Sequence, residues 1–242
     1  MNSIQNKKIE VIDWGRISYK EAWDKQESLF KSIVDIKLEN RKRNEAGLES
    51  IETPNYLVIC EHPHVFTLGK SGHEEYMLAN AEKLNEIDAE FIKINRGGDI
   101  TYHGPGQLVV YPILDLDNFF TDIHKYLRFL EEIIIETIAE FGINGDRYTG
   151  FTGVWIDPEI PQKARKICAM GIRCSRWVTM HGLALNVHSD LNYFNHIIPC
   201  GISDKKVASM SSELEREIAI VDVLPPFKKY FAKQFDAVLF ER

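Results

Sequence analysis

Apolar residues recur at helical spacing in three long segments of the chain. Ser18 begins a capping-box pattern, and the apolar positions after it predict a helix to about Leu38. A second helix is predicted over Thr121–Phe141, with Thr121 as N-cap, and a third over Asp222–Gln234, with Asp222 as N-cap. The charged segment 39–52, which follows the first helix, is predicted to be a loop.

Between these helices the apolar residues alternate or form short continuous runs, as in β-strands. The predicted strands are Lys8–Trp14, Tyr56–Cys60, Glu90–Ile94, Leu108–Leu114, Arg147–Tyr148, Gly153–Ile156, Ala164–Arg173 and Val178–Val187. The last two are long enough to pair as a hairpin through residues 174–177. Short helices are predicted over Ala79–Leu84 and Asp190–Asn195. Strands and helices mix without strict alternation, so the sequence predicts an α+β fold with a mixed β-sheet flanked by helices.

Length and charge narrow the class of protein. The 242 residues, 44% of them hydrophobic, contain no linker rich in Pro, Ser or Gly, so we expect a single domain over residues 1–242. The net charge of −7 argues against nucleic acid or an anionic membrane as partner. The polar N-terminus and the lack of a long apolar run predict a cytoplasmic protein whose four cysteines are reduced.

Residues 96–107, with the sequence RGGDITYHGPGQ, hold four glycines and a proline around one Arg and one His. Glycine is required where the backbone takes a positive φ or approaches a ligand closely, so this stretch predicts a shaped loop. An apolar strand follows it directly. A shaped loop on a core strand is a common way to build a binding site, although a tight surface connection would also use glycine.

Two further positions carry possible chemistry. Lys166 lies in a predicted strand on the same face as Cys168, Met170 and Ile172, where partial burial would favour the neutral amine and make it a base. A lysine at a sheet edge that reaches water is the alternative. Cys200, between Pro199 and Gly201, could present its sulfur to a pocket, although a lone cysteine is more often inert. Cys174, at the predicted hairpin turn, is the rival nucleophile.

These stretches together resemble one family, the lipoyl(octanoyl) transferases, which are related in fold to biotin and lipoate protein ligases. The matching segments, in the family's order, are HPHVFTLGK at 62–70, RGGDITYHGPGQ at 96–107, KICAMGIR at 166–173, HGLALNV at 181–187 and PCGI at 199–202. The loop after Pro199 is more polar than the family pattern suggests, and residues 39–54 form a longer connection than the family's minimum.

The resemblance implies an acyltransferase that needs no cofactor or metal. The implied donor is octanoyl-acyl carrier protein, and the implied acceptors are lysines in the lipoyl domains of 2-oxoacid dehydrogenases and in the glycine cleavage H protein. Cys200 would accept the octanoyl group as a thioester, and Lys166 would manage its proton. The implied acyl-pocket residues are Arg96, Gly97, Gly98, Asp99, Ile100, Thr101, Tyr102, His103, Ala169, Met170, Gly171, Gly182, Leu183 and Ala184.

Residues 161–189 contain five basic residues and no acidic ones, namely Lys163, Arg165, Lys166, Arg173 and Arg176. Because acyl carrier proteins are acidic, we expect this stretch to form a basic docking face. Charge reversal at Arg173 or Arg176 should then weaken the carrier step and make it more sensitive to salt.

Other activities remain open from the residues alone. An ATP-dependent lipoate or biotin ligase would share the fold but would not need the Cys and Lys pair. A cysteine hydrolase could use Cys200 with His181 or His196 and would release free acid. A metal site at His62, His64 and His73 is the weakest alternative, because no acidic partner accompanies these histidines.

Overall fold

The computed structural model describes residues 5–198 and 206–241. Its main feature is a sheet of nine strands in the order β12-β1-β2-β6-β10-β9-β8-β7, with β11 paired to β9. The strands of this sheet are β1 (Lys8–Arg16), β2 (Tyr56–Glu61), β6 (Gln107–Ile113), β7 (Gly145–Tyr148), β8 (Phe151–Ile156), β9 (Arg165–Ser175), β10 (Val178–Asn186), β11 (Lys206–Val207) and β12 (Val238–Phe240). β1 runs parallel to β2 and β12, and β2, β6, β10, β9, β8 and β7 are joined by antiparallel pairings, so the sheet is mixed, as predicted.

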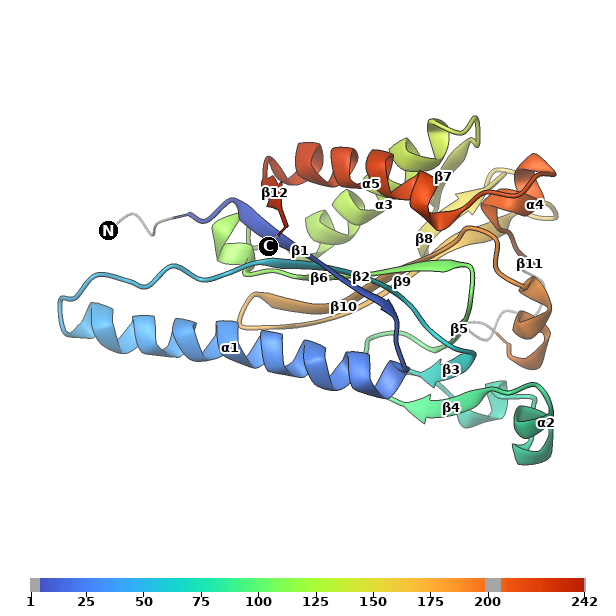
Figure 1. Ribbon diagram of the computed structural model, residues 1–242, viewed down its shortest axis with the longest axis horizontal. Helices are drawn as coiled ribbons and strands as arrows, with labels where there is room; N and C mark the ends of the chain where they lie inside the picture. Colours follow the sequence, from blue (N-terminus) through green and yellow to red (C-terminus); the bar gives the residue numbers. More distant parts are fainter. Residues whose placement is uncertain (1–4, 199–205, 242) are drawn as a thin grey trace.

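Helices cover both faces of this sheet (Figure 1). α1 (Tyr19–Glu45) lies along one face and packs on apolar side chains of β2, β6 and β10. α3 (Ile123–Ala139) and α5 (Ile220–Phe235) lie side by side on the other face, over the largest buried cluster. The short α4 (Met210–Leu214) adds Met210 to that cluster.

A second, three-stranded sheet lies beyond the N-terminal end of α1, in the order β4-β3-β5. It consists of β3 (Val65–Leu68), β4 (Glu90–Lys93) and β5 (Ile100–His103), with α2 (Ala81–Glu86) preceding β4. β5 corrects one expectation, because it falls inside the stretch predicted to be a loop. Its side chains alternate across the strand, and β3 supplies the pairing partner.

Several predicted helix boundaries are wrong. α1 continues to Glu45, seven residues beyond Leu38, because its last turns are held by polar contacts such as the Arg41–Glu45 ion pair. The N-cap of α3 is Asp122, whose carboxylate accepts a hydrogen bond from the Lys125 N–H. α5 begins after Ala219, so Asp222 lies in its first turn, where a carboxylate complements the helix dipole. Residues 191–196 form a 3₁₀ helix, η3, capped by the Asp190 side chain.

Candidate active site

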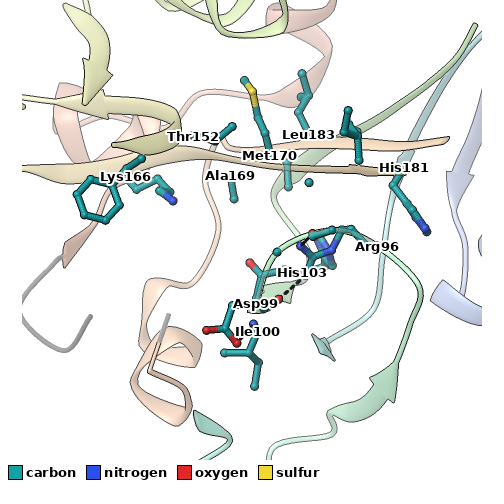
Figure 2. A pocket seen from close by; sticks show the side chains of 18 of the residues that line it. Arg96, Asp99, Ile100, His103, Thr152, Lys166, Ala169, Met170, His181 and Leu183 are labelled. Carbon is teal, nitrogen blue, oxygen red and sulfur yellow. Dashed lines mark hydrogen bonds between the residues drawn. The ribbon is translucent and has the colours of Figure 1, made fainter. Parts of the chain in front are cut away.

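A cavity of about 480 Å³ opens between the two sheets, within the size range of small-molecule sites. Arg96, Asp99, Ile100 and His103 approach it from the β5 side and face Ala169 and Lys166 on β9 (Figure 2). Met170 and Leu183 project to the other side of their strands. β9 and β10 pair in antiparallel register through Gly171 and Gly182, which brings the KICAMGIR and HGLALNV segments together.

The glycine-rich loop is attached to both sheets. The Gly97 N–H donates to the Ile172 carbonyl on the edge of β9 (3.1 Å), and the Lys70 N–H donates to the Arg96 carbonyl (2.9 Å). A Cβ at Gly69 would lie 2.2 Å from the Gly98 carbonyl oxygen, so glycine is required there. The HPHVFTLGK segment therefore supports the loop directly, because Gly69 and Lys70 contact the backbone of the loop at Gly98 and Arg96.

Arg96 is 8% exposed and its guanidinium hydrogen-bonds to backbone carbonyls of its own loop. Nη1 donates to the Gly97 oxygen (2.7 Å) and Nη2 to the Asp99 oxygen (2.8 Å). An ideal Cβ at Gly171 would lie 2.6 Å from Arg96 Nη1. The absence of a side chain at residue 171 is therefore what leaves room for the arginine.

The prediction that Lys166 shares a strand face with Cys168, Met170 and Ile172 is wrong, because β9 contains a bulge. β8 pairs Val154 with Cys168 but Trp155 with Lys166, so Ile167 is an extra residue in the ladder. Ile167 and Cys168 both pack toward α3 and α5, whereas Lys166 lines the cavity, on the same side as Ala169. The Lys166 ammonium lies 4.7 Å from the centre of the Trp155 ring.

The cavity depends on a divergence of β8 from β9. Gly153 has φ +117° and its N–H donates to the carboxylate of Glu131 on α3 (3.0 Å), away from β9. Glu131 is fully buried and also accepts from Arg128 and Arg147. The residues of β8 that precede Val154 do not pair with β9. This leaves part of the edge of β9 free to accept the hydrogen bond from Gly97.

Three rings line the deep part of the cavity, those of Tyr19, His103 and Tyr111. His62 lies behind them, with its Nδ1 2.8 Å from the Ile17 carbonyl oxygen and its Nε2 2.6 Å from the Tyr111 hydroxyl. Since a carbonyl can only accept, Nδ1 carries the proton and Tyr111 donates to Nε2. Burial lowers the pKa of His62 to about 4, so this ring is neutral.

His103 is neutral for the same reason. Its pKa is lowered well below the usual value by burial, with further lowering by His62 and Arg96. Gln107 donates its amide to the Tyr102 carbonyl and to Asn186, so its oxygen accepts from His103 Nδ1 (3.1 Å). The three rings in this part of the cavity are therefore uncharged, and the charge close to them is the guanidinium of Arg96.

His181 is also buried, and burial lowers its pKa to about 3. Its Nε2 lies 3.0 Å from the Asn95 oxygen, and the Asn95 amide donates to Glu27. The side chain of His181 is thus bound to a fixed amide at one nitrogen, which is a structural use of this histidine.

The predicted site residues fall into three groups. The cavity is lined by Arg96, Gly97, Gly98, Asp99, Ile100, Thr101, His103, Lys166, Ala169, Met170, Gly171, Gly182, Leu183 and Ala184. Tyr102 points to the opposite face of β5, where it stacks on Tyr193 (4.9 Å between ring centres) and its hydroxyl hydrogen-bonds with His64. Cys200 lies outside the described residues.

The other three cysteines are poor nucleophiles. Burial raises the pKa of Cys60 and of Cys168, and both side chains are buried. Burial also raises the pKa of Cys174, at the far end of β9. At about 3.3 Å per residue, Cys174 is roughly 26 Å from Lys166 along the strand. Cys174 does not share the cavity with Lys166.

Sequence reasoning missed several lining residues, among them Tyr19, Tyr111, Leu127 and Trp155. They lie in ordinary helix and strand patterns, and none belongs to a glycine-rich or charged motif. A preference for burial was the only signal they carried, and it does not distinguish a core residue from a pocket wall.

The predicted basic face does not form as one surface. Arg165 is paired with Asp157 and Glu213, and Arg173 with Glu27, so carboxylates from elsewhere in the chain offset these charges. Lys163 and Arg176 are exposed but lie beyond opposite ends of β9. The sequence could not reveal these partners because they are distant along the chain.

The described part of the chain holds no group of three His, Cys, Asp or Glu side chains placed to bind a metal. His62 and His64 are each hydrogen-bonded to a tyrosine hydroxyl. Within residues 5–198 and 206–241, no helix combines the length and apolar character needed to cross a bilayer.

Comparison with known proteins places this geometry in a family. Residues 18–232 match the model of the lipoyl protein ligase A/B catalytic domain. The chain is 57% identical over 235 residues to a Christiangramia forsetii protein named octanoyltransferase, covering 97% of this chain and 98% of that protein. A Cytophaga hutchinsonii protein of the same name is 54% identical over 241 residues, covering 100% of this chain and 96% of that protein.

Solved structures show the same fold at low sequence identity. Lipoate-protein ligase A bound with ATP superposes with a TM-score of 0.67 at 14% identity, covering 98% of this chain and 88% of that chain. A bipartite lipoate protein ligase from Thermoplasma acidophilum gives 0.66 at 15% identity, covering 98% and 87%. The α+β fold expected from the sequence is confirmed. The chain belongs to the lipoyl protein ligase A/B catalytic-domain family.

Proposed function

We infer that this protein is an octanoyltransferase, which transfers an octanoyl group to a lysine of a lipoyl-dependent protein. The observation that carries this inference is the 57% identity, over almost the whole of both chains, to a protein named octanoyltransferase. The cavity supports it, since a pocket lined largely by aromatic and apolar side chains, with uncharged histidines, suits a fatty acyl chain.

We propose that Cys200 and Lys166 carry the reaction. The described residues on either side of Cys200 are well anchored. On the N-terminal side, Ile197 forms a β-bridge with Met77. On the C-terminal side, Val207 pairs with Lys166, and the Ala208 N–H donates to the Lys166 carbonyl. The chain that follows the proposed nucleophile therefore returns to the backbone of the proposed base, which supports their joint use.

In the first step Lys166 takes the thiol proton of Cys200, and the thiolate attacks the octanoyl carbonyl of the donor. The new carbon–sulfur bond replaces the bond to the pantetheine sulfur of the acyl carrier protein, and Lys166 returns the proton to that sulfur. In the second step the acceptor lysine loses a proton to Lys166 and its amine attacks the enzyme thioester. An amide forms, and Cys200 leaves as a thiolate that is protonated again.

These two reaction steps need no cofactor, because one thioester is exchanged for another before the amide forms. The proposed acceptors are the lipoyl domains of 2-oxoacid dehydrogenases and the glycine cleavage H protein. A site of action in the cytoplasm is proposed with them. Backbone N–H groups near Gly171 and Gly182 are the proposed donors to the developing oxyanion.

Intact mass spectrometry after mixing with octanoyl-acyl carrier protein tests the proposal. We expect an added octanoyl mass in the unmodified protein and in Cys174→Ser, and none in Cys200→Ser. Transfer of that mass to a lipoyl domain completes the test. Retention of the adduct in Cys200→Ser would refute the assignment of the nucleophile.

A parallel incubation with free octanoate and ATP separates the transferase from a ligase. A ligase would modify the lipoyl domain under those conditions without carrier protein. We expect no modification with octanoate and ATP. Release of free octanoate without transfer would instead indicate a hydrolase.

A further inference from the structure

The residues that line the cavity range from exposed to almost fully buried. Gly98, Thr152 and Lys206 at the mouth are exposed, whereas Tyr19 is 2% exposed and Tyr111 is 3% exposed. An apolar chain that enters from the mouth gains most by burying its end against these deep rings.

The deep rings pack against one another and form one wall of the cavity. The Tyr19 ring stacks on His103, with 5.6 Å between ring centres and 18° between planes. His62 contacts Tyr19 at 5.1 Å and His103 at 5.9 Å from behind. Tyr111 is held by its hydrogen bond to His62. A chain whose end reaches these rings could advance past them only by displacing one of them.

Of the three rings, Tyr19 is held least by side-chain hydrogen bonds from the described residues. His103 is fixed by Gln107, and Tyr111 by His62. Tyr19 is the first residue of α1, and behind it lie the apolar side chains of Trp23, Val65 and Ile94. Removing its ring would extend the cavity toward apolar surface, which can accept further methylene groups.

We propose that Tyr19 sets the length of the acyl chain that the protein transfers, as the end wall of the acyl pocket. This inference rests on the proposed octanoyl transfer. No motif of the sequence assigns a role to this residue. The wall rejects chains longer than it can hold because a methylene that does not fit a close-packed site must displace its neighbours.

The test compares transfer of hexanoyl, octanoyl, decanoyl and dodecanoyl groups from acyl carrier protein to a lipoyl domain. In Tyr19→Ala we expect the ratio of kcat/KM for decanoyl to that for octanoyl to rise at least about tenfold, because decanoyl is longer by two methylene groups and each methylene in a hydrophobic pocket is worth about 10- to 200-fold. The matched control is Phe30→Ala, which removes another buried ring of α1 outside the cavity lining. We expect its ratio to match that of the unmodified protein.

A second variant tests the wall if Tyr19→Ala does not fold. Ala184 lines the same cavity and is 4% exposed, so Ala184→Leu fills space in front of the wall. We expect it to move the preferred chain from octanoyl to hexanoyl. A decanoyl to octanoyl ratio unchanged within twofold in folded Tyr19→Ala would overturn the proposal, as would an unchanged preference in Ala184→Leu. Failure of the unmodified protein to transfer octanoyl would refute the proposed function itself.

Discussion

Gly171 shows how one missing side chain can position a charged one. Its Cβ would lie 2.6 Å from Arg96 Nη1 and 2.9 Å from the Gly97 carbonyl oxygen. The end of the arginine side chain can swing away at modest cost, and the Gly97 carbonyl needs to shift only slightly. The consequence of adding a methyl group should therefore appear in activity more than in stability.

We expect Gly171→Ala to lower kcat/KM for acyl transfer by roughly 10- to 100-fold, since small displacements of positioning groups have effects of that size. Its free energy of unfolding should change by no more than about 1 kcal/mol, as for a typical substitution without a cavity or a buried charge. Steady-state kinetics and urea unfolding of the same preparation measure both. Full activity would show that the position of Arg96 does not matter.

The neutral histidines make stability depend on pH. The pKa of His62 is lowered to about 4 in the folded protein by burial, whereas an unfolded histidine has a value near 6.5. Below pH 6.5 the unfolded chain therefore binds more protons than the folded one. The contribution to stability is fully present above that pH and declines as the pH falls.

We expect the free energy of unfolding to fall by roughly 2 kcal/mol between pH 6.5 and pH 5 on account of His62 alone. Urea titrations at both pH values measure this loss. In His62→Gln the loss should be smaller by about that amount, because the other titrating groups are unchanged. Equal losses in the two proteins would mean that His62 is not kept neutral by folding.

At the scale of elements, the site depends on where β8 leaves β9. Glu131 on α3 is fully buried and binds the Gly153 N–H, Arg128 and Arg147. This carboxylate satisfies a backbone donor that would otherwise point into an unpaired part of the sheet. One buried residue thereby joins α3, β7 and β8 and keeps the edge of β9 open to the glycine-rich loop.

Glu131→Leu should cost about 1–3 kcal/mol of unfolding free energy, because it leaves the buried Gly153 N–H without an acceptor, whereas Arg128 and Arg147 are partly exposed and water can solvate them. Glu131→Gln is the matched control, since its amide oxygen can still accept from Gly153, and we expect about half the loss. Urea unfolding of both variants measures the difference. Similar small losses in both would show that the carboxylate is not needed for this junction.

A second pair of elements is joined by aromatic stacking. The centre of the Tyr193 ring, in η3, lies 4.0 Å from that of His64 and 4.9 Å from that of Tyr102, and the three rings are nearly parallel. Tyr102 therefore attaches η3 to β5 and faces away from the cavity. The other predicted site residues of its motif line the cavity, whereas the Tyr102 side chain packs between η3 and β5.

Over the whole molecule, ion pairing decides which basic residues can meet an acidic carrier protein. Lys163 precedes β9 near the cavity mouth, and Arg176 lies in the turn at the other end of the β9–β10 hairpin. The eleven residues of β9 lie between them and, in ten steps of about 3.3 Å, span about 33 Å, so one small carrier at the mouth would not meet both Lys163 and Arg176.

We expect Lys163→Glu to reduce kcat/KM for octanoyl-acyl carrier protein several-fold at low salt, with the difference shrinking as ionic strength rises. Arg176→Glu is the control with the same change of charge, and we expect little effect there. Stopped assays over a range of salt concentrations measure both. An equal effect at Arg176 would indicate docking along the whole hairpin.

The sequence by itself determined the family, the three long helices and most strands of the large sheet, but it did not predict β3, β5 or β12. Periodicity is a local property, so the β9–β10 hairpin and the core of α3 could be predicted from neighbouring residues. Three of the five ordered motifs, at 96–107, 166–173 and 181–187, contain residues of the cavity lining, and each site residue predicted from these three lines the cavity except Tyr102.

Only the tertiary structure decided how those residues face. The bulge at Ile167 turns Lys166 into the cavity, carboxylates from distant segments neutralise Arg165 and Arg173, and Tyr19 becomes a pocket wall. Each of these depends on contacts between residues far apart in the chain. Local patterns cannot encode such contacts, because the same apolar or charged position can serve a core, a surface or a site.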